Sequence, residues 1–267
     1  MAYDSPYQSA LLSQNYHIFI ADLSLAGAKE LAATHNTPSQ AKVHYAGTDV
    51  SSWDSQLSAF KQALQVLGDR IDFVAPIAGI GERKWLPFEQ EILAMGKREF
   101  AKPDMTVLDV DLTGVFYTVA LGVQQFRRQE KDSQGSRGKL GLVASICGIS
   151  PVPTLPVYSA AKYGVAGLTR TYGKLLPEEG ITLNAVCPGV ARTNINTPAF
   201  YESVKNDGII APIGGVVDAF IEMIEGDREC RVIYGWAKKE EELYDEWLQK
   251  SLDVLDKAHR PMHYSEF

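Results

Sequence analysis

Short apolar runs alternate with longer amphipathic segments from residue 16 onward, and this alternation constrains the fold of the chain most strongly. Each run is four to six residues long and mostly apolar, which is typical of strands buried on both faces of a sheet. Strands that alternate with helices imply parallel strands joined by crossover helices. The sequence therefore predicts an α/β fold with a doubly wound parallel sheet in a single domain.

The predicted strands cover residues 16–21, 43–46, 73–78, 140–144, 182–186 and 231–234. The predicted helices cover residues 25–34, 53–67, 105–128, 157–176 and 216–225. Sheets of this kind bind ligands at the carboxyl ends of their strands, so the residues that follow the strands are the first candidates for function.

The 267 residues suffice for one large domain, which we assign to residues 1–236. Residues 237–267 are predicted to form a C-terminal amphipathic helix and tail. Five apolar residues recur there at helical spacing among charged ones: Leu243, Trp247, Leu248, Leu252 and Leu255. We favour packing of this helix against its own domain over a role in binding a partner.

Acidic residues outnumber basic ones, 33 against 26, and the net charge of -7 disfavours binding to nucleic acid or to anionic membranes. Cys147, Cys187 and Cys230 lie in or beside apolar stretches, which indicates reduced thiols. The five histidines lack metal-ligand spacing, so we expect no metal site. We also expect no leader segment and no stretch long enough to span a membrane, and hence a cytoplasmic protein.

Tyr158 and Lys162 stand four residues apart on a predicted helix, and Ser145 lies thirteen positions before Tyr158, directly after a predicted strand. Residues four apart share one face of a helix. A phenol with its ordinary pKa of about 10 is a poor acid-base catalyst at neutral pH, and an adjacent cation lowers that pKa. We therefore predict that Lys162 activates Tyr158 for proton transfer, and that Ser145 binds the oxygen of a carbonyl or an alcohol.

With these residues the chain resembles the short-chain dehydrogenase/reductase family, whose active site combines a Ser with Tyr-x-x-x-Lys. Further segments similar to motifs of this family are residues 48–50, 72–80, 108–116, 142–148 and 184–193. The similarity extends from about residue 9 to residue 235, which is most of the chain.

The resemblance implies a Rossmann-like fold, a nicotinamide dinucleotide as cofactor, and interconversion of a secondary alcohol and a ketone. It assigns catalysis to Ser145, Tyr158, Lys162 and Asp111, the last standing where the family has Asn. It assigns cofactor binding to Asp49, Val50, Gly79, Tyr158, Lys162, Pro188, Gly189 and Thr193. Members of the family commonly form homodimers or homotetramers, and we expect the same here.

Asp22 follows the first predicted strand, where a carboxylate accepts a hydrogen bond from a ribose 2′-hydroxyl and repels a 2′-phosphate. The sequence therefore favours NAD(H) over NADP(H). The alternative is that Asp22 caps the N-terminus of the following helix.

Besides Asp111, two further elements of the family pattern are altered. The family's first strand and glycine-rich turn, which receive the pyrophosphate, have no counterpart in residues 1–15. Either the natural chain has about 15 to 20 more residues, a length suited to a strand and a turn, or the chain is a truncated relative that has lost dinucleotide binding. In addition, Pro76 and Ile77 replace the Asn-Asn that precedes the family's Ala-Gly, which removes hydrogen-bond donors from that turn.

Apolar residues after strand ends and in loops predict a small apolar substrate, of the kind found in specialised metabolism. The candidates are Cys147, Val152, Leu155, Trp85, Phe88, Phe200 and Tyr201. Two alternatives to an oxidoreductase stay open: a non-redox isomerase or dehydratase that uses the same pocket, and a catalytically inactive scaffold protein.

Overall fold

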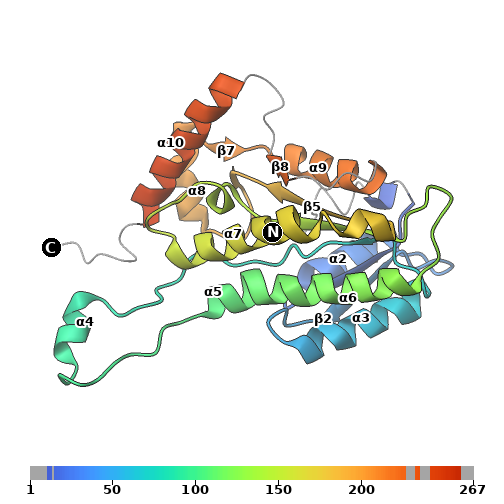
Figure 1. Cartoon of the computed structure of the whole chain (residues 1–267), viewed down its shortest axis with the longest axis horizontal. Coiled ribbons are helices and arrows are strands. Elements are labelled where there is room, and N and C mark those ends of the chain that lie inside the picture. The colour runs from blue at the N-terminus through green and yellow to red at the C-terminus, as the bar shows by residue number, and fades with distance from the viewer. Residues whose placement is uncertain (1–10, 14, 227–231, 235–240, 260–267) are drawn as a thin grey trace.

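The computed structural model describes residues 11–13, 15–226, 232–234 and 241–259, and it has the predicted α/β architecture (Figure 1). Its larger sheet has four parallel strands in the order β3-β4-β5-β8. These strands span Phe73–Val74, Gly138–Val143, Ile181–Cys187 and Val232–Tyr234. Strands β1 (Ile18–Asp22) and β2 (Val43–Gly47) pair in parallel as a second sheet. A third pair, β6 (Val190–Ala191) and β7 (Ile210–Ala211), follows β5 in the chain.

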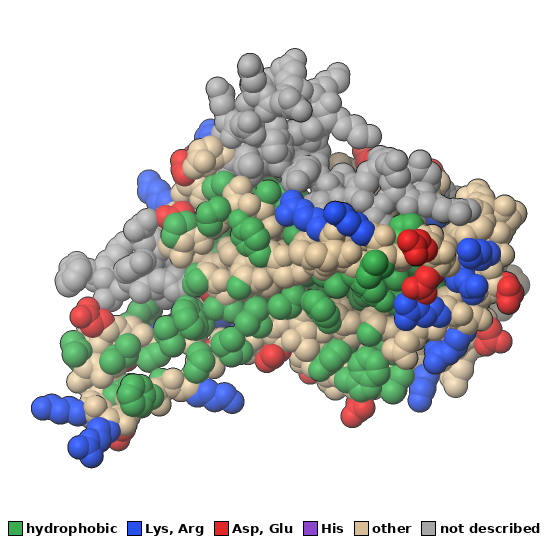
Figure 2. Space-filling model, viewed as in Figure 1, with side chains coloured by type: hydrophobic (Ala, Val, Ile, Leu, Met, Phe, Trp, Pro, Cys, Tyr) green, Lys and Arg blue, Asp and Glu red, His purple; other side chains and the backbone are tan. Residues whose placement is uncertain are grey.

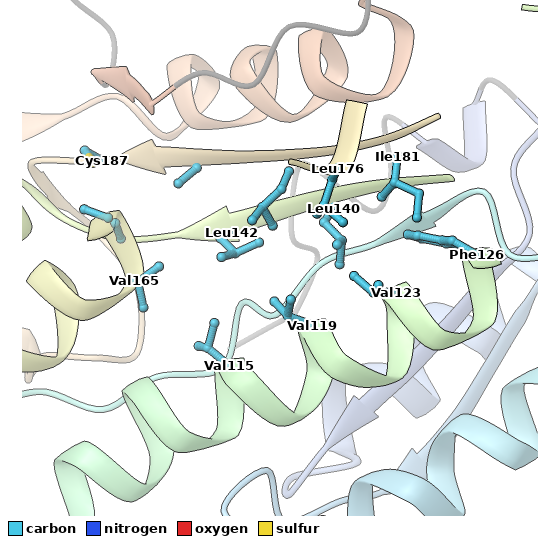
Figure 3. Packing of buried hydrophobic residues seen from close by; sticks show 14 of the residues in the cluster. Val115, Val119, Val123, Phe126, Leu140, Leu142, Val165, Leu176, Ile181 and Cys187 are labelled. Carbon is cyan, nitrogen blue, oxygen red and sulfur yellow. The ribbon is translucent and has the colours of Figure 1, made fainter. Parts of the chain in front are cut away.

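The side chains of β4 and β5 alternate between two hydrophobic layers. Leu140 and Leu183, which are paired in the sheet, face α6 (Gly114–Arg128) and α7 (Pro156–Tyr172), as Figure 3 shows for the cluster around them. Val143 and Val186 are out of phase with these leucines and pack against α9 (Ile213–Glu225) instead. Successive residues of a strand point to opposite faces of a sheet, so helices on both faces explain why every residue of β5 is buried.

The remaining helices are α2 (Ala26–His35), α3 (Trp53–Leu67), α4 (Glu89–Ala94), α5 (Thr106–Leu108), α8 (Pro198–Val204) and α10 (Glu241–His259). Helix α4 lies at the far end of an extended connection, away from the sheets (Figure 1). Helix α10 buries Leu252 and Leu255 against a cluster that includes Ile146, so it packs on its own domain. Cys230 and the side chains of Leu243, Trp247 and Leu248 lie outside the described residues.

Local signals explain where the main helices begin and end. Ser52 caps α3, because its hydroxyl accepts a hydrogen bond from the backbone N–H of Ser55. Gly68 ends that helix with a φ of 93°, a conformation that glycine adopts without strain. Pro156 begins α7 at a position where a missing N–H costs nothing. The prediction of a helix over residues 53–67 is confirmed to the residue.

Other predicted boundaries are corrected. The strand predicted over residues 73–78 ends at Val74, because Pro76 has no N–H to donate to a neighbouring strand. The helix predicted over residues 105–128 is divided by a π-helical turn, Asp109–Thr113. The helix predicted over residues 157–176 ends at Tyr172. Helices α4 and α8 and strands β6 and β7 were not predicted, because they are too short to show a hydrophobic period.

The sheet is interrupted between β1 and β3. Within the described residues, β1 pairs with β2 alone and β3 pairs with β4 alone. Side chains connect the two halves: Leu11 packs with Phe73 and the α9 layer, and Leu12 packs with Leu31 and Val43. Helix α3 also bridges the halves, since it contacts both β1 and α6.

The helical stretch Thr106–Arg128 is, within the described residues, the one segment long and apolar enough to cross a membrane by length and composition. The expectation that no stretch reaches this length is therefore wrong. Val115, Val119, Val123 and Phe126 of this helix pack against β4 and β5 (Figure 3). One buried face of this kind is typical of a core helix in a globular domain.

Candidate active site

Ser145 is held at the carboxyl end of β4 by the turn that follows it. The residue is buried and its backbone is extended. Its hydroxyl accepts a hydrogen bond from the backbone N–H of Cys147 at 3.2 Å, which starts a short 3-10 turn at Ile146–Gly148. This turn packs directly on α7: a Cβ added to Gly148 would lie 2.5 Å from the carbonyl oxygen of Lys162. Only glycine allows so close an approach.

Tyr158 and Lys162 lie on the face of α7 that meets this turn. Tyr158 is half-buried and Lys162 is buried. The Lys162 ammonium lies 5.3 Å from the centre of the Tyr158 ring. The fold thus brings Ser145, Tyr158 and Lys162 together as predicted, because β4 and the first turns of α7 meet at one edge of the sheet.

Asp111 forms a buried ion pair with Lys162. Its Oδ2 lies 3.1 Å from Lys162 Nζ, and the two side chains are 0% and 4% exposed. Its Oδ1 accepts a hydrogen bond from the backbone N–H of Ile80 at 2.8 Å. Asp111 sits on the π-helical turn between α5 and α6, and such turns are often found at functional sites. The Asp111 carboxylate therefore connects the start of α6 both to α7, through Lys162, and to the segment after β3, through Ile80.

This ion pair alters the proton chemistry that the sequence predicts for Tyr158. Burial raises the pKa of Tyr158 above its usual value; the charges of Cys147 and Asp111 raise it further, and hydrogen bonding to the Ser145 hydroxyl opposes the shift. The net shift of the Tyr158 pKa is therefore upward, whereas the sequence predicted a net lowering by Lys162. The Lys162 charge is balanced by Asp111, whose own pKa is raised by burial and held down in part by Lys162. Tyr158 is accordingly a protonated phenol at neutral pH.

Asp22, Asp49 and Val50 lie together at the carboxyl ends of β1 and β2. The backbone N–H of Thr48 donates to the carbonyl oxygen of Asp22 at 2.9 Å, which joins the two strand ends. The Asp22 carboxylate accepts from the backbone N–H of Ser24 at 2.8 Å. Helix α2 is instead preceded by Leu25, with no capping side chain, so the alternative assignment of Asp22 as the helix cap is wrong.

Gly79 lies beside the ion pair, because a Cβ placed on it would come within 3.1 Å of Asp111 Oδ2. A side chain at this position would crowd the carboxylate that holds Lys162. The structure thus places Gly79 beside the Lys162–Asp111 pair.

Pro188, Gly189 and Thr193 form the loop that follows β5. The carbonyl oxygen of Pro188 accepts from the backbone N–H of Ile146 at 3.0 Å, next to Ser145. Tyr201 of α8 braces the same loop: its hydroxyl donates to the carbonyl oxygen of Ala191 and accepts from the backbone N–H of Thr193, both at 3.0 Å. Tyr201 was predicted to contact the substrate, and its role in bracing this loop was not predicted. Thr197 and Pro198, a capping residue followed by a first-turn proline, are the signal that could have predicted α8.

A cavity of about 150 Å³ opens beside Ser145 and Tyr158. Its walls include the predicted residues Cys147, Leu155, Pro188, Gly189 and Thr193, and also Gly81, Glu82, Val143, Ala144, Ile146, Val190, Ala191, Ile195, Asn196 and Leu255. Val152 is buried in the cluster that also holds Cys147 and Leu155. Trp85, Phe88 and Phe200 do not line the cavity, whereas Glu82 and Leu255 were not predicted. Leu255 reaches it because α10 folds back over the 145–155 segment, a contact that no local pattern shows.

These residues agree with the sequence comparisons. Residues 7–203 match the family described as short chain dehydrogenase. The chain belongs to the short-chain dehydrogenase/reductase family. Members of this family bind NAD(P)(H) and act on small molecules.

Three curated relatives illustrate the similarity. A short-chain dehydrogenase/reductase of Penicillium rubens, prx7, is 31% identical over 80% of this chain and 73% of that protein. A 5'-hydroxyaverantin dehydrogenase of Dothistroma septosporum is 30% identical over 68% of this chain and 61% of that protein. A diacetyl reductase of Staphylococcus epidermidis, (S)-acetoin forming, is 28% identical over 80% and 77%. Among the first relatives, the chain spans between 49% and 73% of their length.

Solved structures agree on the fold. The 3-hydroxyacyl-CoA dehydrogenase type-2 of Mycobacterium avium superposes with a TM-score of 0.68 at 26% identity, over 85% of this chain and 87% of that chain. A levodione reductase superposes with a TM-score of 0.69 at 21% identity, over 85% and 89%. The likeness to the second shows a shared fold alone.

The described residues fit a nicotinamide dinucleotide at its two ends. Lys162 Nζ has Asp111 Oδ2 at 3.1 Å and the carbonyl oxygen of Val143 at 3.3 Å as partners, and an ammonium carries a third N–H for a ribose hydroxyl. Gly79, without a side chain, leaves room beside Asp111. Asp22 stands at the strand end suited to the adenosine ribose. No glycine-rich turn for the pyrophosphate falls within residues 11–13 and 15–17, the described part that precedes β1.

Proposed function

We propose that this protein is an NAD(H)-dependent oxidoreductase that interconverts a secondary alcohol and a ketone on a small, apolar molecule. The observation that carries the proposal is a cavity lined by Ser145 and Tyr158, with the ammonium of the buried Lys162–Asp111 pair 5.3 Å from the centre of the Tyr158 ring. Acid-base groups that have unusual pKa values and line a cleft mark a catalytic site.

Each group has a distinct part in this reaction. The Ser145 hydroxyl hydrogen-bonds the substrate oxygen and orients it toward Tyr158. In the reductive direction the Tyr158 phenol donates its proton to that oxygen, and in the oxidative direction it accepts the proton of the alcohol. Lys162 holds the ribose with its third N–H, and Asp111 fixes the position of that ammonium. The bound dinucleotide supplies or accepts the hydride.

The Asp22 carboxylate supports a preference for NAD(H). It lies at the end of β1, beside the start of the 48–50 segment, where it accepts from a 2′-hydroxyl and repels a 2′-phosphate. Binding of NADH and NADPH to the wild-type chain and to Asp22→Ala measures this preference. We expect the variant to lose affinity for NADH and to reduce the difference between the two nucleotides.

The size and lining of the cavity support a small, uncharged substrate. A volume of about 150 Å³ is that of an engineered apolar cavity able to hold benzene. Most of the lining side chains are apolar, including Val143, Ile146, Leu155 and Leu255. The fungal relatives support a role in specialised metabolism.

We further propose a cytoplasmic homodimer or homotetramer. Apolar side chains gather on the face of the molecule formed by the connection around α4 and by α6 and α7 (Figure 2). Phe116 on α6 and Tyr163 on α7 are 45% and 41% exposed. Exposed apolar patches of this kind are typical of interaction sites, and light scattering of the purified chain measures the assembly directly.

Consumption of NADH with a panel of small cyclic and aromatic ketones tests the proposed reaction. We expect turnover by the wild-type chain and a loss of about 10²- to 10⁴-fold in Tyr158→Phe, with nucleotide affinity retained. Tyr163→Phe, on the exposed side of the same helix, is the matched control and should keep its activity. Undiminished turnover in Tyr158→Phe would contradict the assignment.

The same assays separate the two alternatives. Product formed from a test substrate without nucleotide favours the non-redox isomerase or dehydratase. No nucleotide binding and no turnover favour the scaffold, which the interrupted sheet between β1 and β3 makes a specific alternative.

A further inference from the structure

Glu82 places a carboxylate at the start of the catalytic helix, far from it in sequence. Its Oε2 accepts a hydrogen bond from the backbone N–H of Tyr158 at 2.7 Å, and its Oε1 accepts from that of Val157 at 3.4 Å. The residue before α7, Leu155, has no side chain that can cap the helix. Glu82 therefore caps α7 from the segment after β3, and it satisfies N–H groups that the helix cannot pair internally.

The same carboxylate belongs to the wall of the cavity. Glu82 is only 9% exposed, and it is the one charged side chain among the residues that line the cavity. Its charge acts on the neighbouring Cys147 thiol: burial raises the pKa of Cys147 to about 11, hydrogen bonding to Ser145 and the Lys162 charge oppose that rise, and the Glu82 charge adds to it. The positive end of α7 offsets part of this charge.

We propose that Glu82 determines substrate specificity, by admitting uncharged or cationic groups to the cavity beside Tyr158 and excluding anionic ones. The inference rests on the proposed function, because it names the charge of the substrate for that same site. A carboxylate or phosphate in a cavity of about 150 Å³ would lie within a few ångströms of the Glu82 oxygens. Like charges at such distances repel strongly where water is scarce. A ketone or an alcohol meets no such penalty.

Three aromatic probes of one shape and different charge test this directly: benzamide, benzamidine and benzoate. Their binding to the full wild-type chain is measured by ligand-observed NMR titration, which requires neither nucleotide nor turnover. We expect benzamide and benzamidine to bind at least about tenfold more tightly than benzoate. Equal affinities for benzamide and benzoate would overturn the proposal, and so would a failure of benzamide to bind.

A matched pair of variants assigns the effect to Glu82. Glu82→Gln keeps the shape and one acceptor oxygen for the helix but removes the charge. We expect the benzoate-to-benzamide affinity ratio to rise about tenfold in this variant. Glu89→Gln removes the same charge from the exposed helix α4 and should leave the ratio unchanged. An unchanged ratio in Glu82→Gln, with thermal unfolding near that of the wild type, would overturn the proposal.

The two proposals fail in different ways. If the proposed redox function fails, NADH is not consumed, yet the order of probe affinities is unaffected. If the specificity inference fails, benzoate binds as well as benzamide, whether or not ketones are reduced. If Glu82→Gln fails to fold, the affinities of the wild-type chain for benzamide and benzoate still show whether the cavity excludes an anionic group.

Discussion

The four-stranded and two-stranded halves of the molecule differ in burial. Strand β5, in the first half, is buried at all seven residues, whereas β1, in the second, has no fully buried residue. Ser145, Tyr158, Lys162 and Asp111 all belong to the buried half, and Asp22 and Asp49 to the other. The proposed proton-transfer groups are therefore enclosed by packing, while the residues expected near the adenosine lie on a sheet in which β1 has one unpaired edge within the described residues.

The largest effect should follow from breaking the buried ion pair. Lys162→Met leaves the Asp111 carboxylate buried without a counter-charge, which typically costs about 3–5 kcal/mol of unfolding free energy in denaturant titrations. Burial already raises the pKa of Asp111, so the folded state binds the proton more tightly than the unfolded chain. The loss should therefore grow as the pH rises from about 4 to about 8.

Arg127→Met is the matched control for this experiment. It breaks an ion pair with Glu179 whose side chains are 49% and 37% exposed. Exposed pairs contribute at most about 1 kcal/mol. Similar losses of unfolding free energy in the two variants would mean that the buried Lys162–Asp111 pair contributes no more to stability than an exposed ion pair.

The same substitution in both halves compares their packing. Ile181 in β5 is 0% exposed, and Ile20 in β1 is half-buried. Ile181→Ala should cost about 2–5 kcal/mol of unfolding free energy, and Ile20→Ala about 1 kcal/mol, because the second leaves a smaller cavity. Equal losses would show that β1 is covered as completely as β5.

The pH dependence of turnover tests the protonation of Tyr158. The pKa of Tyr158 is raised, so its phenol remains protonated from about pH 6 to about pH 9. Deprotonation of Tyr158 should therefore not lower the rate of ketone reduction over that range. Alcohol oxidation needs a proton acceptor, so its kcat should rise about tenfold per pH unit over that range. A plateau of the oxidation rate near neutral pH would indicate a lowered pKa.

The smallest effect concerns the loop that joins the cavity to α8. Tyr201→Phe removes the hydroxyl that bonds Ala191 and Thr193 but keeps the ring in place. We expect the dissociation constant for NADH to rise about fivefold, equivalent to about 1 kcal/mol. Tyr163→Phe removes a single surface hydrogen bond to Ile149, at 2.7 Å, and should leave that constant unchanged.

Much of the active site could be predicted because its residues carry local signals. Tyr158 and Lys162 share a helix face through their spacing, and Ser145 follows an apolar strand. Asp111 was predicted from its place in a family motif. The direction of the Tyr158 pKa could not be predicted, because it depends on the burial of Tyr158 and on a counter-charge from a different helix.

The amino-acid sequence by itself determined the α/β architecture, the positions of the main helices and the choice of the proposed proton-transfer residues, because hydrophobic period and residue spacing act within one segment. Only the tertiary structure decided that Glu82 meets the start of α7, that Tyr201 braces the loop after β5, and that Leu255 closes the cavity. These contacts join residues that are eight to more than a hundred positions apart in the chain. They form because the sheet brings its strand ends to one edge, a condition that no single segment encodes.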